Sequence, residues 1–370
     1  MICLFEPQCL AWAHETVNSG VLNLILEQSD ENVVVACEKQ HFNCITVNID
    51  KAKLQRVTFY PFIPEFDVNI DTLAVSSIYE KYIKSVLTNY PDITNFIMLS
   101  SHRGNMESVY KISKSYLYIH FHVVVHAIME NLIKDNLVDE EPFSLAEMIN
   151  KMGGCKNIDF YIYNPLLKKY ACDILTDEVL SKFSFIHHPI ICLDDTNNDV
   201  REDEIVIGIF GACNRFSKKI VENIRWTGHG KFVSVSGGKP YGDLDYVSYI
   251  NDGNRVSRDL IDITAKSTDL YLLPYNKTQY VISISGILID SISYCKPAIM
   301  LDSPILKYYN ERFDIGYQFD DERKMINFIE LVFNSSELPN DYFKKQDNIK
   351  HAVSVMKDEN KITIGNLLRG

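Results

Sequence analysis

Apolar positions along the chain alternate between short continuous runs and longer stretches with helical spacing. Residues 1–5 and 33–37 are apolar runs, and apolar residues recur at helical spacing between Val17 and Leu26. Continuous apolar runs are typical of parallel strands that are buried on both faces. The chain therefore begins with a predicted strand–helix–strand unit.

The same alternation continues along the first half. Further strands are predicted at 44–47, 58–60, 95–100, 116–125 and 158–163, and helices at 72–90, 107–114, 143–152 and 175–183. A polar, acidic segment at 193–204 follows, and a new series begins with a strand at 205–210. We interpret the segment as a linker because it is acidic and carries no apolar periodicity.

The most regular stretch of the second half lies between residues 270 and 301. Leu270–Leu273 and Ala298–Leu301 are apolar runs, and a helical pattern opens at Ser285-Gly286 between them. This spacing predicts a strand–helix–strand crossover. A helix that starts with small residues presents unpaired N–H groups at a partly positive end, which suits a phosphate. A helix that merely packs on the sheet is the equally good alternative.

Two βα-rich halves predict an α/β protein with two doubly wound, Rossmann-like domains that face a cleft. The expected parts are an N-terminal domain at 1–192, an acidic linker at 193–204, a C-terminal domain at 205–345 and a helical segment at 346–370 that can pack back on the first domain.

Composition narrows the class of protein. Over 370 residues the net charge is -12 at pH 7, which argues against a broad nucleic-acid surface. The nine cysteines show no paired spacing, as expected for free thiols in a reducing compartment. No leader or spanning run is apparent. We therefore expect a cytoplasmic protein with at most peripheral contact at the inner face of a membrane; the oligomeric state stays open.

No cofactor or metal is expected. The phosphate-binding glycine motifs and the GxSxG nucleophile turn are missing from the strand–helix turns. His120 and His122 lie in an apolar run with no cysteine or carboxylate at ligand spacing. Strand alternation explains this pair better than a metal site does.

The first turn of the second half carries two cations. Arg215 and Lys219 follow the Gly208–Gly211 strand end at a spacing that places them on one helix face. Such cations can neutralise a diphosphate. A solvated basic helix start is the alternative.

The second half resembles the donor domain of GT-B glycosyltransferases, especially the family-4-like retaining group. The residues that match the family pattern, in order, are Gly208, Gly211, Arg215, Lys219, Asp269, Pro274, Tyr275, Ser285, Gly286, Asp290, Lys296 and Pro297. The resemblance covers residues 205 to 320.

This resemblance implies a donor site for a nucleotide sugar. The helix start at Ser285 and Gly286 would hold the donor phosphate, and Asp290 would bind the ribose. Gly211 and Tyr275 would also belong to the donor site.

Arg215 and Lys219 would act as catalytic groups that stabilise the departing nucleotide diphosphate, so that no metal is needed. One position departs from the family pattern, because Ile282 stands where the first glutamate of E-x7-E is expected. The donor sugar, and retention against inversion, therefore stay open.

The first half resembles a GT-B acceptor domain. Val123–Glu130 resembles the strand that ends in a conserved histidine of the family, so His126 would position or deprotonate an acceptor. A structural histidine at a strand end is the alternative. His14 and Asn18 resemble the family's first helix start, and His102 follows a strand, so all three are acceptor-side candidates. His187-His188-Pro189 resembles the structural junction before the linker.

Together these features predict a glycosyltransferase of the hexosyl type, retaining and metal-independent. It would move a sugar from a UDP- or GDP-linked donor to a hydroxyl of a glycan or lipid-linked acceptor, in surface polysaccharide or glycoconjugate synthesis. Two alternatives remain: a sugar-nucleotide epimerase of the same architecture, and a non-catalytic nucleotide or glycan binder. Donor, acceptor and linkage cannot be derived from a fold analogy.

Overall fold

The computed structural model describes the chain except for residues 12, 48, 64–71, 126–129, 131, 133–144, 191–203, 212–217, 236–237, 255, 276–279 and 370. The chain divides into two compact units. Unit 1 comprises Met1–Ile191 and Met356–Gly370, and unit 2 comprises Cys192–Val355. Most of the expected linker at 193–204 lies outside the described residues.

The described strands of unit 1 form one parallel sheet. They are β1 (Ile2–Phe5), β2 (Val33–Cys37), β3 (Val57–Pro61), β4 (Asn95–Met98), β5 (His120–Val124), β6 (Ile158–Ile162) and β7 (Phe183–Phe185). Their order is β3-β2-β1-β4-β5-β6-β7. The order reverses between β1 and β4, which makes this sheet doubly wound as predicted.

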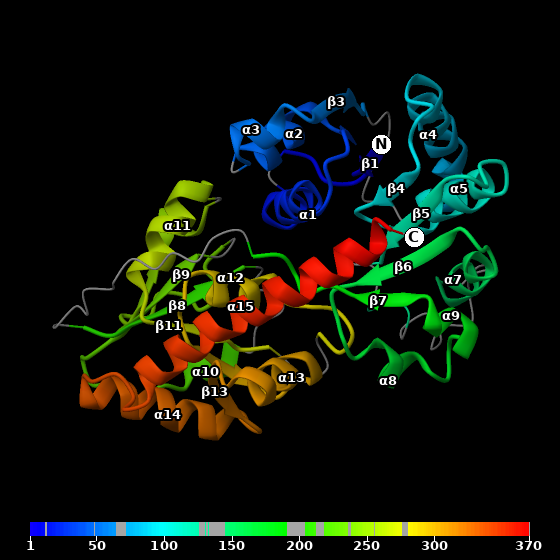
Figure 1. Cartoon of the computed structure of the whole chain (residues 1–370). Coiled ribbons are helices and arrows are strands. Elements are labelled where there is room, and N and C mark those ends of the chain that lie inside the picture. The colour runs from blue at the N-terminus through cyan, green and yellow to red at the C-terminus, as the bar shows by residue number, and fades with distance from the viewer. Residues whose placement is uncertain are drawn as a thin grey trace. The chain divides into compact units, whose positions relative to one another are not determined.

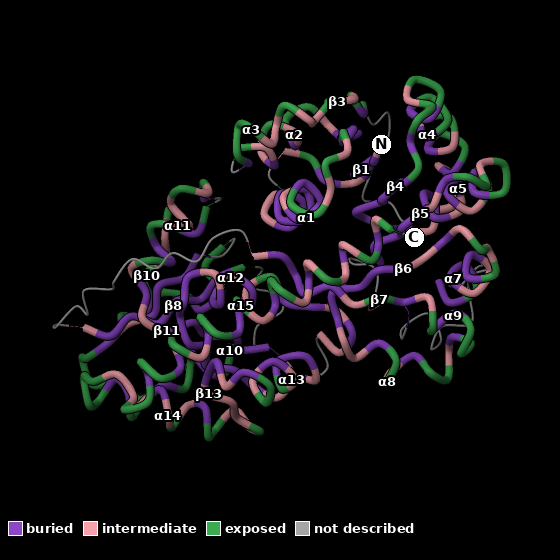
Figure 2. Tube along the Cα trace, viewed as in Figure 1, coloured by how far each residue is buried: buried purple, intermediate pink, exposed green. Residues whose placement is uncertain are grey.

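The helices among the described residues of unit 1 cover both faces of this sheet. They are α1 (Glu15–Gln28), α2 (Lys39–Thr46), α3 (Lys51–Leu54), α4 (Ser76–Asn89), α5 (Arg103–Ser113), α7 (Leu145–Gly153), α8 (Leu167–Ala171) and α9 (Asp177–Ser181), with the short 3-10 turn η1 (Leu73–Val75) before α4. α1 contacts α2, whereas α4, α5, α7 and α9 pack in series as a second layer (Figure 1). The inner strands β1, β2, β4, β5 and β6 are buried along almost their whole length, whereas the edge strands β3 and β7 are partly exposed (Figure 2).

The described strands of unit 2 also form a parallel sheet. They are β8 (Val206–Phe210), β9 (Lys231–Val235), β10 (Val247–Tyr249), β11 (Leu270–Leu273), β12 (Ala298–Leu301) and β13 (Gly316–Phe319). Their order is β10-β9-β8-β11-β12-β13, so the direction of winding reverses between β8 and β11. The predicted fold class, two doubly wound α/β sheets, is therefore confirmed.

The described helices of unit 2 again lie on two sides of the sheet. They are α10 (Lys218–Glu222), the 3-10 turn η4 (Ile250–Gly253), α11 (Arg258–Ser267), α12 (Gly286–Ser293), α13 (Pro304–Phe313) and α14 (Glu322–Ser335). α11 packs on β8 and β9, and α14 contacts α10, β12 and β13 (Figure 1). The long helix α15 (Tyr342–Leu367) begins in unit 2 and ends in unit 1. Within the described residues, no helix is both long and apolar enough to cross a membrane.

Some element predictions were wrong. Cys44–Val47 is not a strand, because Glu38 caps a helix there by accepting hydrogen bonds from the Gln40 and His41 N–H groups. His41 and Ile45 then face the core one turn apart. The predicted strand at 116–125 begins only at His120. Strand β7 and helix α13 were not predicted.

Candidate functional site

The switch point of the unit 2 sheet gathers three of the predicted donor-site segments. In open α/β sheets, ligands bind beyond the carboxyl ends of the strands at such a point. Gly211 directly follows β8, Tyr275 follows β11, and α12 begins at Gly286 after the same strand. These segments are separate in sequence, and the sheet order brings them to one edge.

Gly211 lies against the first turn of α12. Its φ is +91°, and a Cβ atom placed on it would lie 2.4 Å from Ile287 Cδ1. A side chain here would therefore require both a strained backbone and a displaced Ile287. Arg215, the next predicted residue along the chain, lies outside the described residues, and Lys219 is exposed on α10.

The start of α12 is held by buried hydroxyl groups. Ser285 is the N-cap, and its Oγ accepts a hydrogen bond of 3.4 Å from the Leu288 N–H. The Tyr275 hydroxyl is 2.8 Å from the same Oγ, and both side chains are buried. Gly286 is exposed and has open space where a Cβ would stand. Because the first N–H groups of a helix lack intrahelical partners, this end can receive an anion.

Asp290 lies one turn further along α12 and is half-buried. Burial, followed by the negative charge of Asp290, holds the pKa of the Tyr271 hydroxyl well above its usual range. Asp290 is therefore close enough to Tyr271 on β11 for its charge to act on that hydroxyl. A carboxylate in this position is suited to accept hydrogen bonds from vicinal hydroxyls.

Three other residues of the matched pattern have structural partners. Asp269 Oδ2 accepts a hydrogen bond of 2.8 Å from the Val206 N–H and so holds β11 to the start of β8. The buried Lys296 donates from Nζ to the Lys266 carbonyl at 3.1 Å. Ile282, at the position where the family has a glutamate, is fully buried and apolar. It offers no carboxylate to a sugar.

The switch point of unit 1 carries a buried carboxylate that sequence reasoning did not select. Glu6 directly follows β1 and is 1% exposed. Its carboxylate accepts hydrogen bonds from Ser100 Oγ at 2.7 Å and Asn18 Nδ2 at 2.8 Å, and from the Gln8 and Cys9 N–H groups. Burial, and then the charge of Glu6, raises the pKa of the Cys9 thiol. Only the pairing of β1 with β4 reveals this cluster.

Asn18 connects this carboxylate to the loop after β1. Its amide donates to Glu6 and also lies 3.0 Å from His41 Nε2, which must therefore be the acceptor. The Nδ1–H of His41 is then left to donate to the Ala11 carbonyl at 2.7 Å. Asn18 is thus part of a chain of hydrogen bonds that fixes the β1–α1 loop.

The predicted acceptor-side histidines have different surroundings. His14 is exposed at the N-cap position of α1, with a left-handed φ of 53°. His102 is buried and caps α5: its ring accepts from the Asn105 N–H at 3.3 Å and lies 3.0 Å from the Tyr79 hydroxyl. These contacts hold the start of α5 in place. His126, the catalytic candidate, lies outside the described residues.

The histidine pair before the linker is buried in unit 1. His187 Nε2 is 2.6 Å from Glu359 on α15. Its backbone N–H and carbonyl both bond to the Asn360 side chain, at 2.6 and 2.8 Å. Burial, and then the neighbouring His14, lowers the pKa of His188 to about 3. The ring of His188 is therefore neutral at physiological pH.

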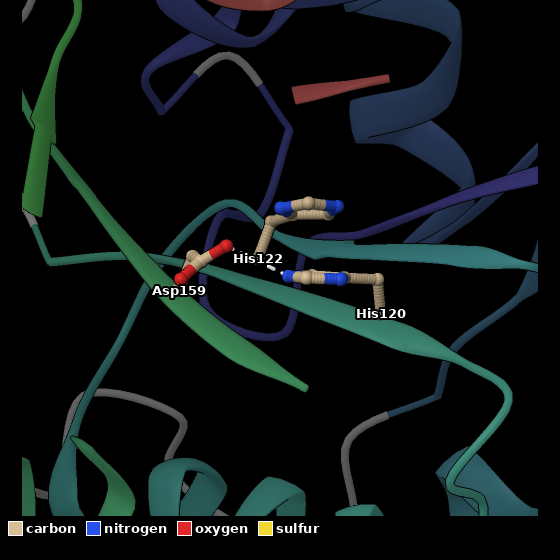
Figure 3. Close-up of side chains that lie close together, drawn as sticks. All are labelled: His120, His122 and Asp159. Atoms are coloured by element: carbon tan, nitrogen blue, oxygen red, sulfur yellow. Dashed lines mark hydrogen bonds and ion pairs between the residues drawn. The ribbon is translucent and has the colours of Figure 1, made fainter. Parts of the chain in front are cut away.

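A further cluster lies at the amino end of β5. His120 and His122 are stacked, with ring centroids 4.7 Å apart, and His120 Nε2 is 2.7 Å from the Asp159 carboxylate on β6 (Figure 3). Burial raises the pKa of Asp159, but the hydrogen bond and charge of His120 outweigh it and lower the pKa below its usual value. This end of the sheet is opposite to the carboxyl edge where Glu6 lies.

Comparisons with known proteins support the fold. No family model and no curated protein sequence matches the chain. Among solved structures, a glycosyltransferase from Rickettsia africae ESF-5 matches with a TM-score of 0.66 and 11% identity, over 100% of this chain and 99% of the other. Anabaena HepE in complex with UDP and glucose matches with a TM-score of 0.62 and 11% identity, over 100% and 98%. Arabidopsis thaliana UGT89C1 complexed with quercetin matches at 0.58 and 10%, over 98% of each chain.

The matches extend over both units at very low identity. They therefore show that the chain has the two-domain architecture of GT-B glycosyltransferases, as expected. The family-4-like subgroup is not distinguished, because plant, cyanobacterial and rickettsial enzymes all match to a similar degree. A shared fold does not fix an activity.

Proposed function

We propose that this chain is a glycosyltransferase that uses a nucleoside diphosphate sugar and transfers the sugar to a hydroxyl of a glycan or lipid-linked acceptor. The proposal rests on one observation: Gly211 lies against the first turn of α12 at the unit 2 switch point. There, a glycine with a positive φ lies beside a helix start that Ser285 caps, and the first N–H groups of that helix are available for a diphosphate.

We infer that the donor nucleotide is UDP-linked. HepE has been solved with UDP and with UDP and glucose, and UGT89C1 with UDP-L-rhamnose. In our proposal the start of α12 binds the phosphates and Asp290 accepts hydrogen bonds from the ribose hydroxyls. Arg215 and Lys219 stabilise the charge that develops on the departing diphosphate, so the reaction proceeds without a metal.

The acceptor is proposed to bind at unit 1, with His126 as the group that positions or deprotonates its hydroxyl. His14 is a second acceptor-side candidate because it is exposed beside the loop fixed by Asn18 and His41. Asn18 and His102 are positioning residues in this scheme. Retention of configuration and a role in surface polysaccharide synthesis belong to the same proposal.

The test is calorimetric titration of the full chain with UDP and with GDP. Replacing Asp290 by Asn should weaken UDP binding by about tenfold to a hundredfold, because hydrogen bonds to a charged group contribute roughly 1.5–3 kcal/mol. The matched control is Asp259→Asn, which removes an exposed carboxylate from α11. Equal UDP affinity in both variants and the unchanged chain would refute the donor site.

Product analysis then distinguishes the activities. With a UDP-sugar and a panel of glycan and lipid-linked acceptors, a transferase releases UDP only when an acceptor is present. An epimerase converts the donor without any acceptor. Nucleotide binding without turnover on the whole panel would instead indicate a non-catalytic binder.

A further inference from the structure

We propose that His120, His122 and Asp159 form a binding site for a divalent transition metal, with Zn²⁺ as the best match. The three side chains come from the paired strands β5 and β6 of unit 1. Their ligand atoms all lie within 4.8 Å of one another. Two imidazoles and one carboxylate form a ligand set that zinc binds with water as the fourth ligand.

The strand geometry places the three groups on one face. His120 and His122 are two positions apart on β5, so both side chains point to the same side of the sheet. Asp159 on β6 is the register partner of His122. Figure 3 shows the two rings stacked, with one nitrogen of each on the side where the Asp159 carboxylate lies.

His122 supplies a nitrogen that nothing else in the described residues uses. Its Nε2 is 3.0 Å from Asn95 Oδ1, and because that oxygen can only accept, Nε2 carries the proton. The lone pair is then on Nδ1, which is buried and has no hydrogen-bond partner within the described part of the chain. A buried polar nitrogen without a partner is costly, and a metal ion would satisfy it.

The residues around His120, His122 and Asp159 favour metal binding. The Asn95 bond fixes both the ring orientation and the tautomer of His122, as outer partners do in metal sites. His120 now donates to Asp159, and transfer of that proton to its other nitrogen frees Nε2 for the ion. Lys182 is the nearby cation that would compete, but its ammonium already donates to the carbonyls of Cys155 and Ile158.

A metal ion can reach the three side chains from solvent, and the side chains can move to the distances that zinc requires. The side chains of His120 and Asp159 are 22% and 35% exposed, so an ion can enter from solvent. Tetrahedral zinc with bonds near 2.0–2.1 Å holds its ligand atoms about 3.3 Å apart. His120 Nε2 and the Asp159 carboxylate, now 2.7 Å apart, must therefore separate slightly, and the wider separations, all within 4.8 Å, must shorten. Both changes can come from the two partly exposed side chains.

Bound zinc would join β5 to β6 at the amino end of the sheet, opposite to the carboxyl edge where Glu6 lies. Its effect is expected on stability and not on the chemistry of sugar transfer. An ion that binds only the folded chain raises the free energy of unfolding by mass action.

The test uses the full chain after dialysis against a chelator. Titration with zinc chloride should show one ion per chain and a higher thermal midpoint, whereas magnesium chloride, whose ion prefers oxygen ligands, should have no effect. His120→Ala and Asp159→Asn should each weaken zinc binding by at least about tenfold. His229→Ala, at an exposed histidine of unit 2, is the matched control and should bind as the unchanged chain does.

Two further measurements keep the outcome interpretable. The cobalt(II) spectrum should lack a thiolate charge-transfer band, which separates this site from the free cysteines. Circular dichroism and thermal melting without zinc check that each variant is folded, and Asp159→Asn preserves the side-chain shape if His120→Ala does not fold. Absence of zinc binding, or equal binding by folded variants and control, overturns the proposal, and neither result depends on the transferase activity.

Discussion

Single residues at the unit 2 switch point explain why small side chains recur there. Gly211 needs its left-handed φ and touches Ile287, while Gly286 is exposed and leaves the space before the helix open. Ser285 caps the helix and is itself held by Tyr275. Backbone conformation and close approach therefore require glycine at 211, and helix capping favours serine at 285, whether or not a ligand is bound.

Gly211→Ala should weaken UDP binding by at least about tenfold, because the new methyl group strains the backbone by roughly 1–2 kcal/mol and displaces Ile287 from the helix start. Calorimetric titration with UDP measures the effect. Gly228→Ala is the matched control, since Gly228 also has a positive φ, of 97°, but has nothing within 4 Å of an added Cβ. Comparable UDP affinity in the two variants would show that the Gly211 turn does not shape the nucleotide site.

At the scale of elements, the packing of α15 depends on specific hydrogen bonds to other parts of the chain. Its first part bonds to unit 2, where the Tyr342 hydroxyl donates to the Asp269 carbonyl. Its last part bonds to unit 1 through Glu359 and Asn360, which hold His187. The helix is mostly polar, so these specific contacts, together with buried Ile364 and Leu367, fix where its end packs.

Asn360→Ala should destabilise unit 1 by about 2 kcal/mol, because it removes the two hydrogen bonds that the Asn360 side chain makes with the buried backbone of His187. Hydrogen exchange of the β7 and His187 segment, followed by mass spectrometry, should report faster exchange there. Asn366→Ala, at an exposed position of the same helix, should change stability by no more than about 0.5 kcal/mol. Equal protection in both variants would contradict the assigned role of Asn360.

At the scale of the whole molecule, the two units differ in how they should respond to acid. Unit 1 contains His188, whose pKa burial lowers from 6.5 to about 3. In the unfolded chain His188 therefore becomes protonated near pH 6.5, whereas in the folded chain it stays neutral until the pH is near 3. The stability contributed by the neutral ring is fully present above pH 6.5 and is lost as the pH falls toward 3. The histidines of unit 2, His229 and His351, are both exposed.

When the pH falls from neutral to about 5.5, the protonation equilibrium of His188 alone should thus lower the free energy of unfolding of unit 1 by about 1.4 kcal/mol. Hydrogen exchange at the two pH values, corrected for intrinsic rates, would report this loss for peptides of unit 1, with unit 2 as the internal reference. His188→Gln should show a smaller pH dependence than the unchanged chain. An identical dependence in the variant would mean that His188 does not control it.

Much of the fold could be predicted from the sequence, because a parallel strand buried on both faces must be a short apolar run, as β1, β2 and β11 are. The prediction at 44–47 failed where such a run was only part of a helix whose cap, Glu38, precedes it. The donor-site segments were also recognisable, since glycine and serine at strand ends mark tight turns and helix caps. Their roles, like those of His126 and Arg215, stay predictions.

The sequence by itself thus determined most of the strands, the two α/β halves and the segments that end at a switch point, because apolar spacing and turn residues act locally. The tertiary structure alone decided which distant side chains meet. Ser100 bonds Glu6 across 94 positions, and Asp159 reaches His120 across 39. Such pairs form only when strands are placed side by side in the sheet, and no local pattern encodes that pairing.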